Sequence, residues 1–234
     1  MSVLWPSSFV PVAPSAHANF TTPPPWQREL WTDFPIRDVS IAYVARDDAY
    51  YLTGTTGAPT WWVNNTGIMM WTSTDEMSTW TPLGMESVHG GKYVWSFEHD
   101  ATWQPRDGSA ALWAPEVHFL RGTFFIPYCI GRAGTPGLGT GLLRSTSGRA
   151  DGPYVDVKPS GPLTDQIDAS LHVAADGSVF FLHQNGLVAR MRDDLSDLAE
   201  NSSLLVASPS GSRGSSPSRR RRAASLSSAR LGSR

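Results

Sequence analysis

The chain has 234 residues, of which 40% are hydrophobic and 17% charged, and it contains 10 Trp, 21 Gly and 18 Pro at a net charge of −2. No stretch approaches the roughly 18 consecutive apolar residues that a membrane-spanning helix needs, so we expect no membrane association of that kind. The only cysteine, Cys129, excludes an internal disulfide framework. This aromatic-rich and turn-rich composition favours an all-β protein.

Residues 1–30 are predicted to be a Pro-rich lead-in or an imperfect secretion signal. An Ala-His-Ala triplet at 16–18 fits a small-x-small cleavage site. The segment lacks a basic start, however, and Pro6, Pro11 and Pro14 interrupt its apolar run. We expect regular structure to begin close to residue 31.

Two later stretches share one pattern. "PIRDVSIAY" and "QIDASLHV" each place one aspartate, Asp38 and Asp168, directly before a run in which alternate residues are apolar. A turn and an aromatic pair follow in both cases, and Asp38 precedes Tyr50 by as many residues as Asp168 precedes Phe180. Alternation of this kind is typical of strands, so both stretches predict a β-hairpin with an acid at its entrance.

Between them, "WAPEVHFLRGTFFIPYCIG" predicts a third hairpin with a tighter turn, in which Glu116 aligns with the serine rather than the aspartate of the other two. Glycines at 67, 139 and 186 are predicted to open a third strand after each hairpin. Four-stranded units repeated at spacings of 40–80 residues are typical of β-propeller blades. We expect blade one to end near Gly84, blade two to cover about 110–157 and blade three to begin near 165.

The last 34 residues contain seven Arg but no Lys and no acidic residue, which leaves 12 basic and 21 acidic residues in 1–200. Ser/Arg low complexity cannot bury enough apolar surface to offset its ordering entropy, so we predict a disordered tail over 201–234. Its "SRRRR" run could attract nucleic acid. The abrupt change of composition instead favours translated intron or a shifted reading frame, and we expect no nucleic-acid partner.

Taken together, "RDVSIAYV", "YYLTGT", "WTSTDEMSTW", "WAPEVHFLRGTFF", "GPYVDV" and "IDASLHVAADGSVFFLHQNG" resemble glycoside hydrolase family 43 over about residues 31–200. The resemblance implies a five-bladed β-propeller and an inverting glycosidase acting on arabinose-, xylose- or galactose-containing plant polysaccharides. Only about two and two-thirds blades are encoded before the tail, so the domain is expected to be truncated after the third blade. The implied location is extracellular, with a cytoplasmic location left open by the poor signal segment, and the implied partner is an oligo- or polysaccharide bound by a monomer.

By resemblance, Asp38 matches the general base and Asp168 the aspartate that modulates the pKa of the general acid. The family often has Pro after each of these aspartates, where this chain has Val39 and Ala169. Inversion requires an ionised carboxylate and a protonated carboxyl on opposite sides of the sugar, about 6.5–9.5 Å apart. A third acid near the donor raises the donor's pKa by repulsion between like charges.

The family's general acid is a glutamate in a Glu-Gly-Pro setting, which does not occur in this sequence. Glu200 is the only glutamate after Asp168, and the repeat places it at the outer edge of a blade. Glu116 and Trp113 are predicted to contact substrate, by lining the pocket and by stacking on a sugar face. The alternatives to a glycosidase are a carbohydrate-binding pseudo-enzyme and a propeller used for protein contacts.

Taken one at a time, several of these residues also have purely structural explanations. An aspartate before a strand, taken alone, is usually a turn or capping residue, and most Trp residues in such a chain pack in the core. The histidines lack the paired spacing of zinc sites, so neither a metal nor a cofactor is expected. Cys129 lies in an apolar strand and is predicted to be buried and unreactive.

Overall fold

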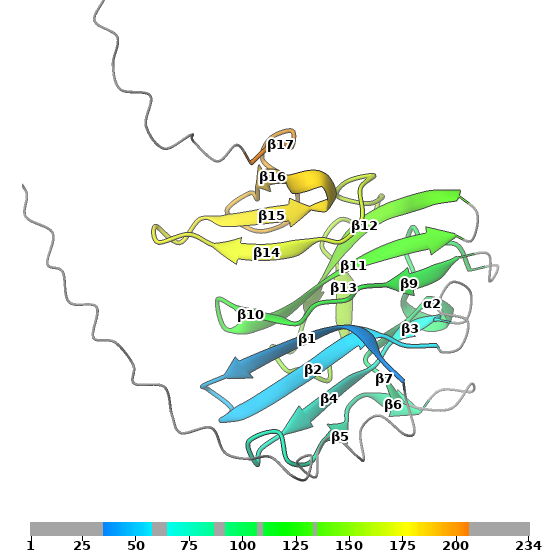
Figure 1. Ribbon diagram of the computed structural model, residues 1–234, viewed down its shortest axis with the longest axis vertical. Coiled ribbons are helices and arrows are strands. Elements are labelled where there is room, and N and C mark those ends of the chain that lie inside the picture. Colours follow the sequence, from blue (N-terminus) through cyan, green and yellow to red (C-terminus); the bar gives the residue numbers. More distant parts are fainter. Residues whose placement is uncertain (1–34, 58–64, 87–91, 107–109, 133–134, 206–234) are drawn as a thin grey trace, which may run out of the picture.

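The computed structural model describes residues 35–57, 65–86, 92–106, 110–132 and 135–205. The predicted lead-in and most of the predicted tail lie outside these residues. Three antiparallel sheets stand side by side, and β10 lies between β1 and β14, the first strands of the other two sheets (Figure 1). The described part of the chain is almost entirely strand and turn, and its sheets do not close into a ring, as in a partial propeller. The predicted all-β propeller architecture is therefore confirmed.

Each sheet is one blade, with its strands in chain order. Blade one consists of β1 (Arg37–Val44), β2 (Ala49–Thr55), β4 (Met70–Ser73) and β5 (Thr81–Pro82). Blade two consists of β10 (His118–Leu120), β11 (Thr123–Arg132), β12 (Thr135–Ser145) and β13 (Tyr154–Asp156), and β9 (Ala111–Trp113) pairs with the far end of β11. Blade three consists of β14 (Ser170–Val173), β15 (Val179–His183), β16 (Leu187–Arg190) and β17 (Ser203–Leu204).

Short elements join strands within and between the blades. Within blade three, a 3-10 turn, η1 (Gln184–Gly186), joins β15 to β16. Between blades one and two, β3 (Gly67–Ile68) pairs with β8 (Trp95–Ser96), β6 (Met85–Glu86) pairs with β7 (Lys92–Tyr93), and the single-turn helix α2 (Phe97–Asp100) follows. No helix among the described residues is long and apolar enough to cross a bilayer.

Three details differ from the predictions. Gly67 opens β3 rather than the third strand of blade one, which begins at Met70. Gly139 lies inside β12, where a β-carbon would come within 2.5 Å of the Thr164 carbonyl oxygen, so glycine here permits the approach of the segment that leads to blade three. The outermost strand of blade three, β17, uses residues that the sequence analysis assigned to the tail.

The predicted equivalence of Tyr50 and Phe180 is also wrong by one residue. Tyr50 pairs with the fifth residue after Asp38, whereas Phe180 pairs with the fourth residue after Asp168. Blade one carries a β-bulge between Arg37 and Ser40, which adds one residue to its inner strand. Its turn is one residue shorter, because four residues link Val44 to its partner Ala49, whereas five link Val173 to its partner Val179 in blade three. The bulge and the turn length together set the register of the hairpin.

Apolar side chains fill the spaces between successive blades. The larger cluster joins blades one and two and includes Tyr51, Trp95, Phe124 and Tyr128. The second joins blades two and three and includes Phe181, which is fully buried. Since burial of apolar surface is the main favourable term in folding, these two clusters hold the blades together.

An arginine in the first turn of a blade also links that blade to the next one. Arg46 of blade one donates to the carbonyl oxygens of Gly122 (3.3 Å) and Gly148 (3.1 Å), both in turns of blade two. Arg121 of blade two likewise donates to the carbonyl oxygens of Gly177 and Asp193 in blade three. The same kind of contact therefore links both pairs of neighbouring blades.

Candidate active site

Asp38 lies at a β-bulge in β1. Arg37 pairs with Thr55 and Ser40 pairs with Thr53, so Asp38 and Val39 together oppose a single residue of β2. A bulge bends the strand and re-aims its side chains. Asp38 has φ 51°, which is uncommon for a residue other than glycine, and its side chain is 43% exposed. The bulge therefore turns this carboxylate out of the sheet towards solvent.

Asp168 occupies the same position in blade three. It precedes β14 and has φ 56°, close to the value for Asp38. Its backbone N–H donates to the sulfur of Cys129 in blade two, with an N···Sγ distance of 2.9 Å. Ala114 is the corresponding residue of blade two and has φ 43°. The three blades thus share one left-handed residue at the entrance to the inner strand, and it is an acid in blades one and three.

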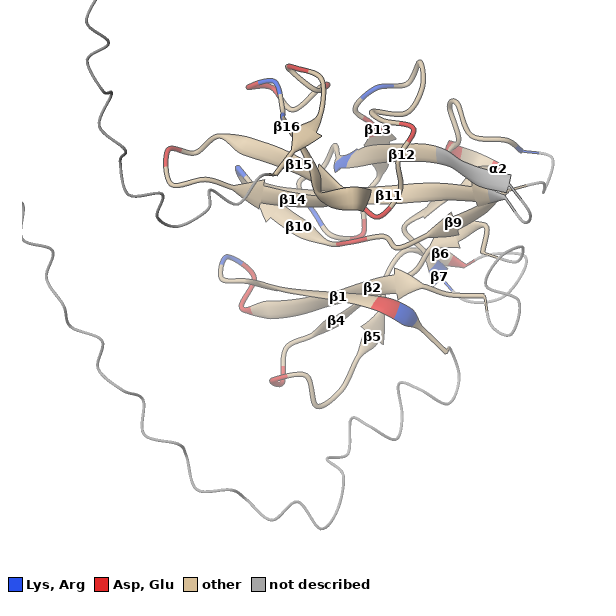
Figure 2. Cartoon of the chain, turned by 45° about the horizontal axis from the view of Figure 1, so that its top comes forward, with Lys and Arg blue, Asp and Glu red and all other residues tan. Residues whose placement is uncertain are grey.

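The two aspartates act on one another electrostatically. Burial raises the pKa of the Asp168 carboxyl, the negative charge of Asp38 raises it further, and the positive charge of Arg37 partly opposes these effects. Arg37 itself lies against Asp38, with an Nε to Oδ2 distance of 3.1 Å. The acidic and basic positions at the start of β1 are visible in Figure 2. Residues 130 positions apart therefore lie within electrostatic reach of each other.

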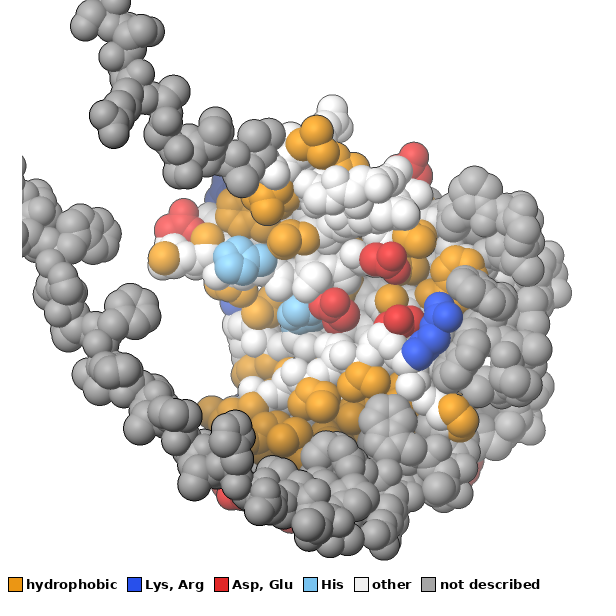
Figure 3. All heavy atoms as spheres, in the orientation of Figure 1, with side chains coloured by type: hydrophobic (Ala, Val, Ile, Leu, Met, Phe, Trp, Pro, Cys, Tyr) orange, Lys and Arg blue, Asp and Glu red, His pale blue; other side chains and the backbone are white. Residues whose placement is uncertain are grey.

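Glu116 lies beside the entrance to the inner strand of blade two. Its side chain is 34% exposed, and Oε2 is 2.9 Å from Nε2 of His118. The next residue, Val117, donates its N–H to Oγ of Ser40 in blade one at 3.1 Å. On the face shown in Figure 3, acidic and histidine side chains gather between the apolar surfaces of the outer blades. The predicted pocket-lining role of Glu116 stays a prediction, and the partner His118 was not foreseen.

Trp113 is mostly covered. Its side chain is 8% exposed and packs with Ala111 and Cys129. A β-carbon on Gly131 would lie 1.9–2.1 Å from three atoms of the Trp113 ring, so the indole lies directly on the backbone of that glycine. Little of the ring is left to stack on a sugar, and its stacking role stays a prediction.

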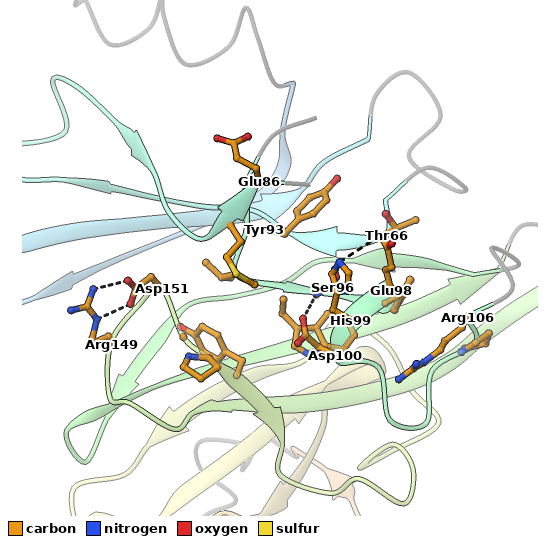
Figure 4. A pocket seen from close by; sticks show the side chains of 18 residues that line it. Thr66, Glu86, Tyr93, Ser96, Glu98, His99, Asp100, Arg106, Arg149 and Asp151 are labelled. Atoms are coloured by element: carbon orange, nitrogen blue, oxygen red, sulfur yellow. Dashed lines mark hydrogen bonds and ion pairs between the residues drawn. The ribbon is translucent and has the colours of Figure 1, made fainter. Parts of the chain in front are cut away.

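Two hollows in the described part of the structure have linings that include neither Asp38 nor Asp168. One of about 930 Å³ lies between the connecting strands β6, β7 and β8 and the turn before β13, where Arg149 and Asp151 form an ion pair at 2.6 Å (Figure 4). The other, of about 610 Å³, lies on blade three and is lined by His183, Asp197 and Glu200 among others. We place the candidate active site at Asp38 and Asp168 instead, because two coupled carboxyl groups can perform acid-base chemistry and size alone cannot.

Glu200 lies where the repeat placed it, at the outer side of blade three. Its Oε1 accepts the backbone N–H of Arg190 at 3.2 Å. In the described part of the chain, no group of three or more His, Cys, Asp or Glu side chains is arranged to hold a metal ion. The site as described therefore consists of Asp38, Asp168, Glu116 and the residues that hold them.

Comparison with known proteins decides the family. The model of the family described as glycosyl hydrolases family 43 matches residues 34–216. The chain belongs to glycosyl hydrolases family 43. This agrees with the resemblance found in the sequence. Among curated proteins, none matches the chain.

Solved structures of family 43 enzymes share the fold at low identity. The endo-arabinase from Bacteroides thetaiotaomicron is 23% identical, with a TM-score of 0.54, over 73% of this chain and 56% of its own. The GH43_1 enzyme from Xanthomonas citri, complexed with xylotriose, is 19% identical, with a TM-score of 0.56, over 74% and 55%. An exo-β-1,3-galactanase from Clostridium thermocellum is 16% identical, with a TM-score of 0.52, over 70% and 36%. The chain thus spans little more than half the length of these family 43 proteins, or less.

Proposed function

We propose that this family 43 chain carries the base and pKa-modulating parts of an inverting glycosidase site. In this proposal Asp38 is the general base that deprotonates the attacking water, and Asp168 raises the pKa of the acid that protonates the leaving oxygen. The observation that carries it is the electrostatic coupling of two aspartates that come from equivalent strand entrances of different blades. A negative charge next to a carboxylic acid keeps that acid protonated at higher pH.

The substrate class proposed is an arabinose-, xylose- or galactose-containing oligo- or polysaccharide, and such polymers favour action outside the cell. The similar structures named above are an endo-arabinase, an enzyme complexed with xylotriose and an exo-β-1,3-galactanase. General acid catalysis contributes about 10²- to 10⁴-fold to rate. Glu116 directly precedes Val117, whose N–H donates to Oγ of Ser40 two residues after Asp38, so we propose that Glu116 contacts substrate.

A second candidate function is carbohydrate binding without hydrolysis. One observation favours it: the Glu200 carboxylate accepts the backbone N–H of Arg190 at the outer side of blade three. Both candidates use the same surface. They differ only in whether a proton donor completes the site.

The test combines hydrolysis with binding. Wild type and Asp38→Asn are assayed for release of nitrophenol from aryl α-L-arabinofuranoside and aryl β-D-xyloside, and for binding of arabino- and xylo-oligosaccharides by calorimetry. Release that disappears in Asp38→Asn supports the glycosidase. Binding that weakens in Asp38→Asn, with no release from either protein, supports the second candidate. A folded protein that neither releases nitrophenol nor binds any of these sugars contradicts both.

A further inference from the structure

Asp38 and Asp168 are both connected to blade two, which lies between them. Neither aspartate is held by its own blade alone, and each connection passes through one buried side chain. These side chains are Thr55 on β2 and Cys129 on β11, and both are fully buried. Left-handed residues other than glycine persist only where surrounding contacts hold them, so the anchors of these two aspartates decide where the carboxyl groups lie.

Thr55 connects Asp38 to blade two. Its Oγ1 accepts the backbone N–H of Ala114 at 2.7 Å and donates to Oδ2 of Asp38 at 2.9 Å. A hydroxyl has a single proton, and Ala114 supplies its own, so the Thr55 proton is directed to the carboxylate. The position of Asp38 is thereby tied to the backbone of Ala114 as well as to β1.

Cys129 connects Asp168 to the same part of blade two. Its sulfur accepts the Asp168 N–H at 2.9 Å, and burial raises the pKa of the thiol, which keeps the sulfur neutral. Thr140, also of blade two, donates to the Gln166 carbonyl oxygen at 2.7 Å and fixes the segment leading to Asp168. The backbone of Asp168 is therefore tied to β11 and β12 before blade three begins.

The two connections meet across one pair of strands. Cys129 on β11 is the register partner of Trp113 on β9, and Ala114 directly follows Trp113. A continuous path therefore runs from the Asp38 carboxylate through Thr55 to Ala114, across this strand pair to Cys129, and on to Asp168. The two side chains that carry the path, Thr55 and Cys129, are both fully buried.

We propose that Thr55 and Cys129 are positioning residues that set the separation of the Asp38 and Asp168 carboxyl groups through blade two. The proposal rests on the proposed function for its catalytic meaning, but the positions of the two carboxyl groups can be tested without any sugar. Burial is the main cause of the raised pKa of Asp168, and the charge of Asp38 adds a further rise that depends on distance, so a loss of that further rise reports that Asp38 has moved away. The other charged or titratable groups that act on Asp168 are Arg37 and Cys129.

The experiment measures the pKa of the Asp168 carboxyl by NMR in the full chain labelled with ¹³C. In wild type we expect it above the ordinary aspartate value. In Thr55→Val and in Cys129→Ala we expect it to fall towards that value, because Asp38 is no longer held beside it. Thr55→Ser and Cys129→Ser retain a hydrogen-bonding atom and are expected to restore most of the wild-type value.

A matched control separates positioning from general damage to the fold. Thr53 is equally buried on the same strand, but its Oγ1 donates to the Met69 carbonyl oxygen at 2.7 Å within blade one. Thr53→Val is therefore expected to lose a buried hydrogen bond and keep the Asp168 pKa. Amide spectra of all variants report whether each is folded, and if Thr55→Val unfolds, Cys129→Ala alone decides.

An unchanged Asp168 pKa in folded Thr55→Val and Cys129→Ala overturns the proposal, as does an equal fall in Thr53→Val. The proposed function fails separately, if wild type neither binds nor cleaves the sugars while its Asp168 pKa responds as expected. Where turnover is detectable, loss of positioning is expected to lower kcat and leave KM nearly unchanged, since the sugar contacts remain.

Discussion

Gly54 is the residue whose substitution should disturb the candidate base most directly. It lies on β2 opposite the bulge at Asp38, and a β-carbon at this position would lie 2.6 Å from the Arg37 carbonyl oxygen and 2.8 Å from Cγ1 of Ile36. Ordinary contacts begin at 3.4 Å, so Gly54→Ala requires the Arg37 backbone to move by about 0.8 Å, the difference between 3.4 and 2.6 Å. Overpacking of this kind costs about 1–3 kcal/mol of stability.

The displaced residue directly precedes Asp38, so the movement should pass to the carboxylate. We expect weaker oligosaccharide binding by calorimetry and, where turnover is detectable, a fall of about 10²-fold, the scale reported for misplacement by 1 Å. Urea unfolding with an unchanged m-value measures the stability loss.

Gly177→Ala is the control for strain alone. Gly177 has φ 83° in the hairpin of blade three, and a β-carbon there meets nothing within 4 Å. Gly177→Ala should lower the free energy of unfolding by about 1 kcal/mol, because alanine is strained in this backbone conformation, and should leave sugar binding unchanged. If Gly54→Ala keeps wild-type stability, or if its binding falls no further than that of Gly177→Ala, the inferred link between the bulge and the carboxylate is wrong.

Three further predictions concern stability. Tyr128→Phe removes a buried hydroxyl that donates to Asp156 at 2.5 Å, so it should lower the free energy of unfolding, measured in urea, by about 1–3 kcal/mol. The control Tyr50→Phe, at a partly exposed tyrosine, should lower it less. Phe181→Ala empties a fully buried site between blades two and three and should cost about 3–5 kcal/mol; a loss below 1 kcal/mol would mean that this cluster does not hold the blades. Hydrogen bonds from Thr79 and Ser73 lower the pKa of Asp75 to about 2, so its contribution is present above about pH 4 and lost as pH falls towards 2. Acid unfolding of Asp75→Asn should therefore differ from that of wild type at pH 5 and converge with it near pH 2, and a constant difference would contradict the assignment.

The repeat of acid, strand, turn and aromatic pair was enough to predict the blades, because alternation of apolar residues and turn residues are local properties of the sequence. The register of the hairpins was not predictable to one residue. Blade one has a bulge at the start of β1 and four residues between Val44 and Ala49, whereas blade three has five residues between Val173 and Val179. Nothing in the spacing of Tyr50 and Phe180 reveals this difference. The bulge and the turn length, not the apolar pattern, decided the pairing.

The site was predictable only in its ionisable residues. Asp38 and Asp168 stand out because each interrupts an otherwise regular strand entrance. Thr55 and Cys129 carry no such signal, because a buried threonine and a buried cysteine in apolar strands are ordinary core residues by sequence. Their role follows from partners 59 and 39 residues away, and only the packing of one blade on the next brings those partners together.

The order of the contacts between blades explains how two distant aspartates can keep a fixed separation in the three described sheets, which among themselves form no closed ring. At the turn side of the blades, Arg46 links blade one to blade two and Arg121 links blade two to blade three. At the other end, where the inner strands β1 and β14 begin, Thr55 links blade one to blade two and Cys129 links blade two to blade three. Each outer blade is therefore held to blade two at both ends of its inner strand as well as by an apolar cluster, which resists rotation as well as translation. The separation of the aspartates then depends on blade two, so changes to its strands β9 and β11 should affect the coupling of Asp38 and Asp168 more than equal changes at the outer strands β5 and β17.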